Sequence, residues 1–247
     1  MVIEILYISS FIVCFIGIII ISAMLSNSYL NKIQQKIDQL VERFNINEFK
    51  PKQVSFSYLI IKRITDLLFS IIISILLIPL FFIIAILIKT DTKGPVFVKL
   101  KKIGKKGISF YAYKFRTIYL LDNISSQKLI TGENNIRVTK VGRFLRKTAL
   151  DGLPGLFNVL NGTMSFVGIT MIGEFEYEHI SKEYKQVLKL CKPGLMNLWI
   201  VSGDRQKFKK NKLFLYNLYY LNNISFKLDI TIIFKTIVMT LGITASY

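Results

Sequence analysis

The sequence has few of the residues that cross-link small domains or hold metal ions in them. It contains two cysteines and one histidine among 247 residues. Cys14 and Cys191 lie far apart, and with His179 as the single imidazole they exclude a disulfide scaffold and a zinc site. We therefore interpret both cysteines as packing residues of a protein in a reducing compartment.

Acidic residues are also scarce, with 15 Asp and Glu against 33 Lys and Arg and a formal net charge of +18. A disordered basic tail is excluded, because such tails lack large apolar residues and this chain has 19 Phe and 12 Tyr. Only two runs are long and apolar enough to enter a bilayer, which excludes a polytopic transporter. The composition predicts a membrane-attached protein with one basic domain of ordinary size.

The first apolar run, Ile5 to Leu25, has no charged residue. At about 1.5 Å per residue its helix would be roughly 31 Å long, the thickness of a hydrocarbon core. A signal peptide is the competing interpretation, but no basic segment precedes the run and no small-residue cleavage site follows it. Lys32, Lys36 and Arg43 follow, so the positive-inside rule predicts an outer N-terminus and a cytoplasmic remainder.

The second apolar run, Ile64 to Ile88, has cations on both flanks. Lys62 and Arg63 precede it, and seven lysines follow between residues 89 and 106. A helix that crossed the bilayer once would leave one of these groups on the outer face, against the positive-inside rule. The charge pattern therefore favours a segment that enters the inner leaflet and turns back, over an ordinary kinked spanning helix.

Pro79 lies near the middle of this second run. A proline there removes one backbone donor and clashes with the carbonyl one turn earlier, so it predicts a bend. We expect the hydroxyl of Ser74 to offer a hydrogen bond to the freed carbonyl of Ile75, since lipid offers none. The sequence thus predicts a helix–break–helix unit.

A β-hairpin is predicted next, with strands at 95–98 and 109–115 around a glycine-containing turn at 103–107. From Lys89 to Arg116 there are nine basic residues and one acid, Asp91. Beside a bilayer, such a patch favours anionic headgroups or an anionic substrate, and a solvated face held inside by its charge is the alternative. No nucleic-acid-binding motif is present, so we expect no nucleic-acid partner.

Further along, Lys140, Arg143 and Lys147 share one predicted helical face, and Asp151 follows them. A carboxylate in this place is a helix cap, a salt-bridge partner or a nucleophile, and taken alone the cap is favoured. Residues 156–160 continue a helix, and residues 164–168 are typical of a buried strand or loop.

A series of short segments between residues 62 and 247 carries a resemblance to a known family. The segments are Lys62-Arg63-Ile64 with Asp66, Pro79, Tyr113–Thr117, Gly142–Thr148, Leu150–Asp151, Leu153–Pro154, Leu156–Leu160, Met164–Gly168, Lys192–Gly194, Leu218–Tyr220, Leu228–Asp229 and Lys235–Ile237. In this order they resemble the bacterial sugar transferases, which are polyprenyl-phosphate phosphoglycosyl transferases. The resemblance covers about three quarters of the chain.

The resemblance implies a monotopic enzyme with a re-entrant helix that transfers a sugar 1-phosphate from a UDP-sugar to undecaprenyl phosphate and releases UMP. It implies Mg²⁺ and an Asp-Glu pair, whose Asp forms a covalent phosphosugar intermediate. Asp151 stands at the nucleophile position. The phosphate-binding residues would be Lys114, Arg116, Arg143, Arg146 and Lys147, and the wedge residues would be Lys62, Arg63, Asp66 and Pro79.

The sequence departs from the family pattern at several positions around Asp151. Gly152 replaces the paired Glu, Gly155 replaces a Gln, Thr163 replaces an Asp, and residues 169–171 replace a Pro-Arg-Pro loop. The acids that remain to help hold a metal with Asp151 are Glu174 and Glu176. These departures support a second hypothesis, a catalytically impaired pseudoenzyme that binds polyprenyl phosphate or an active partner of the same fold.

The sequence as a whole predicts a membrane-anchored α+β protein of the bacterial inner membrane with its main domain in the cytoplasm. The expected parts are a transmembrane helix at 1–26, an amphipathic linker at 27–61, a re-entrant helix at 62–89, a cytosolic domain at 90–212 and interfacial helices at 213–247. The expected partners are a UDP-sugar, undecaprenyl phosphate and membrane lipids. A homo-oligomer and partner glycosyltransferases remain open alternatives.

Overall fold

The computed structural model describes residues 28–33, 35, 39, 54–119, 138–202 and 210–240. The predicted transmembrane helix at 1–26 and much of the linker lie outside these residues. Within them, no single helix is both long and apolar enough to cross a membrane, whereas one bent pair of helices passes the same test together.

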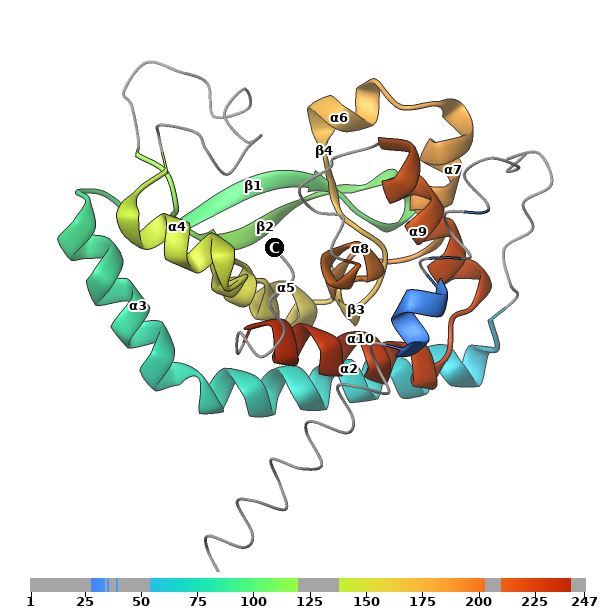
Figure 1. The fold of residues 1–247 in the computed structure, drawn as a ribbon, viewed down its shortest axis with the longest axis horizontal. Helices are drawn as coiled ribbons and strands as arrows, with labels where there is room; N and C mark the ends of the chain where they lie inside the picture. Colours follow the sequence, from blue (N-terminus) through green and yellow to red (C-terminus); the bar gives the residue numbers. More distant parts are fainter. Residues whose placement is uncertain are drawn as a thin grey trace, which may run out of the picture.

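This pair is α2 (Phe56–Leu76) and α3 (Ile78–Asp91), which meet at an angle of 60° (Figure 1). The break lies at Leu77, so Pro79 falls in the first turn of α3. A proline in a first turn loses no helical hydrogen bond, because the N–H there has no partner in any case. The predicted bend is confirmed. The expected contact of Ser74 is wrong, since its hydroxyl is buried without a hydrogen-bond partner among the described residues.

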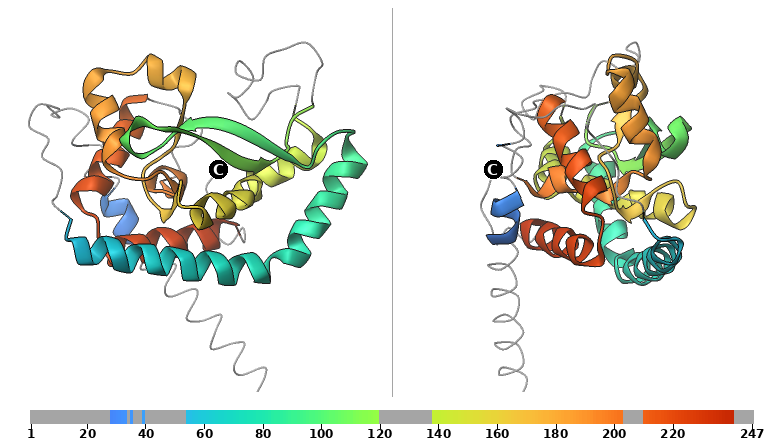
Figure 2. Two further views of the ribbon diagram at one scale, coloured as in Figure 1. Left: turned by 180° about the vertical axis from the view of Figure 1, so that it is seen from behind. Right: turned by 90° about the vertical axis from the view of Figure 1, so that its right-hand side faces the viewer.

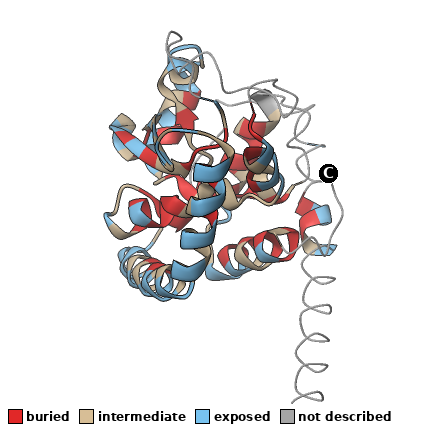
Figure 3. Ribbon diagram, turned by 90° about the vertical axis from the view of Figure 1, so that its left-hand side faces the viewer, coloured by how far each residue is buried: buried red, intermediate tan, exposed pale blue. Residues whose placement is uncertain are grey.

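The outer side of the bent pair is apolar and is not covered by the described part of the protein. Leu68 and Ile72 of α2 and Phe82 and Ile86 of α3 each expose half or more of their surface. Figure 3 shows exposed residues along both helices. A continuous apolar surface of this length is typical of contact with a membrane or a partner.

The predicted hairpin is present, but its first strand lies at Phe97–Ile103 and not at 95–98, because the alternation of side chains continues through the lysines up to the turn. Strands β1 (Phe97–Ile103) and β2 (Ser109–Phe115) are antiparallel, and Phe97 pairs with Phe115. The turn contains the short helix η2 (Lys105–Gly107). Strand β4 (Ile172–Gly173) adds to the other edge of β1 and completes the order β2-β1-β4.

A helical layer separates the hairpin from α2 (Figures 1 and 2). It consists of α4 (Lys140–Lys147), η4 (Leu150–Gly155) and α5 (Leu156–Leu160). The chain then forms β3 (Ser165–Val167), which pairs in parallel with β5 (Gly194–Met196). The predicted helix at 156–160 is therefore confirmed, and the segment at 164–168 contains a buried strand.

The remaining helices enclose the other end of the hairpin and the β3–β5 pair. They are α6 (Glu174–Glu178), α7 (Lys182–Leu190), α8 (Leu198–Val201), α9 (Lys210–Asn222) and α10 (Phe226–Thr240). Helix α10 lies beside α2 in Figures 1 and 2. The predicted C-terminal helix pair is thus present as α9 and α10, and its position at a membrane surface stays a prediction.

Three apolar clusters hold these layers together, and two of them join the helices to the strands near Asp151 or β3. The larger one joins the C-terminal helices to β3, and Phe166, Trp199, Tyr216 and Leu228 are among its buried members. The smaller one joins α3 to β2 and α4. Because the second cluster links α3 directly to the hairpin and to α4, the position of Asp151 just after α4 depends on the bent pair.

Candidate active site

The pairing of Asp151 with Lys114 marks the candidate site. Between α4 and η4 the chain turns at Ala149, which has a left-handed backbone with φ of 57°. This turn brings Asp151, in the first turn of η4, against β2. The Nζ atom of Lys114 lies 2.8 Å from Oδ2 of Asp151, and the two side chains are 31% and 14% exposed. Of the three roles open for Asp151, the structure shows the salt bridge.

Strand register and one buried amide determine where Lys114 lies. Lys114 pairs with Val98, and Ala112 shares its face of the hairpin because side chains alternate along a strand. The buried side chain of Asn158 in α5 accepts from the N–H of Tyr113 at 2.9 Å and donates to the carbonyl of Tyr111 at 2.8 Å. Asn158 thus ties the helical layer that carries Asp151 to the backbone of the strand that carries Lys114.

Gly152 leaves open space beside this ion pair. A Cβ atom built on Gly152 would have no heavy atom within 4 Å, apart from its chain neighbours. Gly155 is different, since a Cβ there would lie 2.7 Å from the side chain of Leu195. The space expected for the paired carboxylate is therefore available, whereas Leu195 fills the space beside Gly155.

The basic residues of α4 lie on two different sides of that helix. Thr139 caps the helix, since its hydroxyl oxygen accepts from the N–H of Gly142 at 2.8 Å. Arg143 and Lys147 are exposed, as the predicted helical face requires. Arg146 is half-buried, and its Nε donates to the hydroxyl of Thr117 at 2.9 Å. Arg146 therefore anchors α4 to the end of the hairpin.

Arg116 is fully buried and binds backbone atoms at the end of the bent helix pair. Its guanidinium donates to the carbonyl oxygens of Lys93 and Thr92, at 2.5 and 2.8 Å. Burial lowers the pKa of this guanidinium, an effect that the nearby carboxylate of Asp91 opposes. Arg116 thus fastens the end of α3 to β2, and the structure shows this role instead of an exposed phosphate contact.

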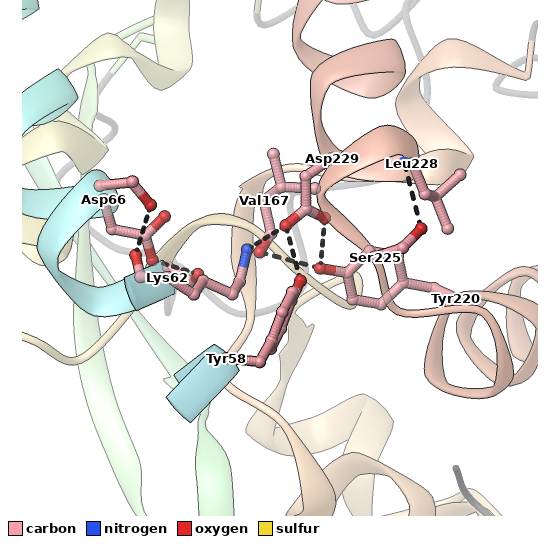
Figure 4. Close-up of polar contacts among 10 residues, drawn as sticks. Tyr58, Lys62, Asp66, Val167, Tyr220, Ser225, Leu228 and Asp229 are labelled. Atoms are coloured by element: carbon pink, nitrogen blue, oxygen red, sulfur yellow. Dashed lines mark hydrogen bonds and ion pairs between the residues drawn. The ribbon is translucent and has the colours of Figure 1, made fainter. Parts of the chain in front are cut away.

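The residues named in the wedge, Lys62, Arg63 and Asp66, face the domain formed by the rest of the described chain. Lys62 forms an ion pair with Asp229 of α10 at 2.6 Å. The same carboxylate accepts from the hydroxyl groups of Tyr58 and Tyr220, as Figure 4 shows. A network of this kind holds α2 in one orientation relative to α10 and the rest of the domain.

The other two wedge residues make contacts of their own. Arg63 donates to the carbonyls of Val159 and Leu160 at 2.7 and 3.1 Å, which satisfies the last turn of α5. Asp66 is buried and accepts from the hydroxyl of Ser165 at the start of β3. The sequence indicated these residues as the opening of the wedge, but their partners lie about 100 positions away and carried no local signal.

Glu174 and Glu176 are held away from Asp151. Glu174 forms an ion pair with Lys101 at 2.9 Å, and Glu176 accepts from the N–H of Gly173 at 2.8 Å. Gly173 pairs with Lys102 of β1, four positions from the partner of Lys114, which is about 13 Å along the strand. Across the ranges that the structure describes, no group of three or more His, Cys, Asp or Glu could hold a metal ion.

Comparisons of the sequence with known proteins identify a family. A family model described as bacterial sugar transferase matches residues 57–242. The UDP-glucose:undecaprenyl-phosphate glucose-1-phosphate transferase of Klebsiella pneumoniae is 37% identical over 187 residues, which are 72% of this chain and 40% of that protein. The undecaprenyl-phosphate galactose phosphotransferase of Salmonella typhimurium is 33% identical over 201 residues, 76% of this chain and 42% of that protein.

For a third relative, the match covers almost the whole length of the protein. The exopolysaccharide production protein PSS of Rhizobium leguminosarum bv. phaseoli is 36% identical over 194 residues, 74% of this chain and 96% of that protein. The chain thus spans about two fifths of the first two relatives and almost all of the third. The match includes the bent helix pair, the hairpin and the segment that carries Asp151, and the chain belongs to the bacterial sugar transferase family.

Proposed function

We propose that this protein transfers a sugar 1-phosphate from a UDP-sugar to undecaprenyl phosphate, the first membrane step in the synthesis of a surface polysaccharide or glycoconjugate. The names of the Klebsiella and Salmonella relatives support these substrates. The observation that carries the proposal is the Lys114–Asp151 ion pair, at the end of a hairpin that Arg116 fastens to the bent helix pair.

In this proposal Asp151 is the nucleophile. One carboxylate oxygen attacks the phosphorus that bears the sugar, the bond from this phosphorus to the bridging oxygen breaks, and UMP leaves. An oxygen of the lipid phosphate then attacks the same phosphorus and releases Asp151. A carboxylate is a weak nucleophile that a diphosphate repels, so cations must neutralise the phosphate oxygens before attack.

Lys114 supplies the first of these cations and orients the carboxylate through its contact with Oδ2. Arg143 and Lys147, exposed on α4, are the proposed contacts for further phosphate oxygens. Arg146 and Arg116 act as positioning residues, since each binds a neighbouring element of the protein.

Mg²⁺ belongs to the proposal through the substrate diphosphate and Asp151. Lys114 engages Oδ2 of Asp151, and no contact among the described residues engages Oδ1, so this oxygen is available as a ligand. Mg²⁺ in such sites is often held by one or two carboxylates together with substrate phosphates. When bound, the ion would neutralise phosphate charge.

The bent helix pair is proposed to be re-entrant and to place the site at the cytoplasmic rim of the bacterial inner membrane. Its exposed apolar side would face lipid, while Lys62, Arg63 and Asp66 hold the opposite side against the domain. Anionic headgroups would then meet the lysine-rich hairpin.

The topology has a direct test with single cysteines at exposed positions on either end of the pair. Ser57→Cys and Lys93→Cys would be made in a Cys14→Ser, Cys191→Ser background and treated with an impermeant maleimide in spheroplasts and in inverted vesicles. We expect both cysteines to react in inverted vesicles alone. Labelling from opposite faces of the membrane would show a spanning helix.

The activity is tested by measuring UMP release from a panel of UDP-sugars by purified protein with undecaprenyl phosphate and Mg²⁺. Asp151→Asn should lower the rate by at least about 10³-fold, because the amide is not a nucleophile. A UDP-sugar labelled in the phosphate next to the sugar should label the wild-type chain and leave Asp151→Asn unlabelled. Undiminished turnover by Asp151→Asn would refute the mechanism.

A pseudoenzyme is the second candidate function, and the missing side chain at Gly152 is the observation in its favour. The open space there allows the decisive variant, Gly152→Glu, with Gly152→Gln as the uncharged control. A pseudoenzyme would release no UMP from any UDP-sugar in its wild-type form, and turnover would appear with Gly152→Glu alone. Turnover by the wild-type protein would exclude this candidate.

A further inference from the structure

Lys102 lies on the same face of the hairpin as Lys114. Along β1 and β2, Lys102 pairs with Phe110 and Lys114 pairs with Val98. Residues directly opposite each other across a pair share a face, and residues two apart along a strand do so as well. Lys102 and Lys114 therefore both project toward the side on which Phe110 and Ala112 pack against α5 and Met164.

The neighbouring lysines of β1 lie on the opposite face and have partners there. Lys101 is ion-paired with Glu174 at 2.9 Å, and Lys99 lies 5.7 Å from the ring centre of Tyr113. Lys102 is half-buried and forms no hydrogen bond or ion pair within the described residues. The nearby carboxylate of Glu176 binds the N–H of Gly173 instead.

The environment of Lys102 is unfavourable for its charge. Burial lowers the pKa of this ammonium, the charge of Lys114 lowers it further, and Glu176 partly compensates. A partly desolvated ammonium group without a hydrogen-bonded partner destabilises the free protein, unless the group loses its proton or binds an anion.

The arrangement of Asp151, Lys114 and Lys102 matches the needs of in-line attack on a diphosphate. When a nucleophile attacks one phosphorus, the leaving group departs on the opposite side of it. Lys114 contacts the nucleophile, and Lys102 lies about 13 Å farther along the hairpin at Cα, with a long flexible side chain that can reach back. In the structure, Nζ of Lys102 lies beside Gly173, 3.7 Å from the position of a Cβ built on that residue. A change of its side-chain rotamer would let Lys102 contact one of two successive phosphates while Lys114 contacts the other.

We propose that Lys102 binds the nucleotide-side phosphate of the UDP-sugar and holds the departing UMP in line with Asp151. This inference rests on the proposed function, and it adds a substrate-binding residue at the end of the site remote from the nucleophile. Lys102 would stabilise the negative charge that develops on UMP as the diphosphate bond breaks.

Binding of nucleotides tests the inference without turnover. UDP and UMP would be titrated into the full chain in lipid nanodiscs by calorimetry, for the wild-type protein, Lys102→Met, Lys102→Gln and Lys102→Arg. We expect both neutral variants to bind UDP at least about 10-fold more weakly, and Lys102→Arg to retain most of the affinity. Lys101→Met is the matched control, because it removes a neighbouring charge on the opposite face, and it should bind like the wild-type protein.

The outcomes separate the inference from the function on which it rests. If the wild-type protein binds UDP and a folded neutral variant of Lys102 binds it equally well, the inference is wrong and the proposed function stands. If the wild-type protein binds neither nucleotide, the proposed function fails and the inference fails with it. Equal weakening in Lys101→Met and Lys102→Met would show a general effect of charge and would also overturn the inference.

Discussion

Lys62 of α2 and Asp229 of α10 form an ion pair of 2.6 Å, although they are 167 positions apart in the chain. Their side chains are 12% and 7% exposed, so water screens the pair weakly. The hydroxyl groups of Tyr58 and Tyr220 share the carboxylate of Asp229. The first helix of the bent pair is thereby joined to the last helix of the protein by a satisfied polar network.

Removal of Asp229 should strongly destabilise the protein. Asp229→Ala leaves the buried ammonium of Lys62 unpaired, and we expect a loss of about 3–5 kcal/mol in the free energy of unfolding. Lys62→Met should lower the free energy of unfolding by less, because the carboxylate of Asp229 keeps its two tyrosine donors. Urea unfolding in detergent micelles measures both changes.

The exposed pair Lys101–Glu174 is the matched control for this prediction. Glu174→Gln should leave the unfolding midpoint nearly unchanged, since exposed ion pairs contribute little. If Asp229→Ala were as harmless as Glu174→Gln, the network would have no part in holding α2 to the domain.

Two glycines near the candidate site should respond in opposite ways to a side chain. Gly152→Glu should change the free energy of unfolding by no more than about 0.5 kcal/mol, because its Cβ meets open space. Gly142→Ala should destabilise by about 3 kcal/mol or more, since its Cβ would lie 2.2 Å from the carbonyl oxygen of Thr117. Thermal unfolding compares the two variants, and a large loss for Gly152→Glu would contradict the open space beside Asp151.

The buried guanidinium of Arg116 should act mainly on stability. Arg116→Met removes the hydrogen bonds to the carbonyls of Thr92 and Lys93, and we expect it to lower the free energy of unfolding by about 2–4 kcal/mol. Arg116→Lys should be intermediate, because a lysine cannot bind both carbonyls in the same fork. A normal stability with a raised KM for the lipid phosphate would instead assign Arg116 to substrate binding.

Cys191 should react slowly with alkylating agents. Burial raises the pKa of its thiol, and the positive charges of Lys62 and Lys105 oppose that shift. In a Cys14→Ser background, we expect alkylation by iodoacetamide at about pH 8.5 to be at least about 10-fold slower in the folded protein than in urea. The alkylation rate should continue to rise above that pH, because a thiol with a raised pKa forms its thiolate at a higher pH than an ordinary cysteine does. Equal rates in folded and unfolded protein would show an accessible, ionised thiol.

Local features of the fold could be predicted from local sequence. The hairpin follows from two short apolar-alternating strands around a glycine turn, and the bend of the second apolar run follows from Pro79. The break itself lies two residues before Pro79, at Leu77, because a proline is best accommodated in the first turn of a new helix. Sequence alone therefore located the bend but not the residue at which the helix stops.

The contacts of the basic residues could not be predicted in the same way. Lys114, Arg116 and Arg146 all lie within recognisable motifs, yet their partners differ. Lys114 pairs with Asp151, Arg116 binds the end of α3 and Arg146 binds Thr117. Glu174 and Glu176 follow the altered loop in sequence, but strand pairing carries them to the far end of β1. Nothing in the local sequence indicated that the side chain of Asn158 would bind the backbone of β2, and the sequence did not predict this contact.

The amino-acid sequence by itself determined the family, the bent apolar pair, the hairpin and the position of Asp151 in the chain, because each depends on neighbouring residues or on the order of motifs. The tertiary structure decided which cation meets Asp151, which carboxylate neutralises Lys62, and which lysines share a face. A salt bridge depends on the separation of two atoms in space, and that separation is set by packing between elements that the chain order leaves free to vary.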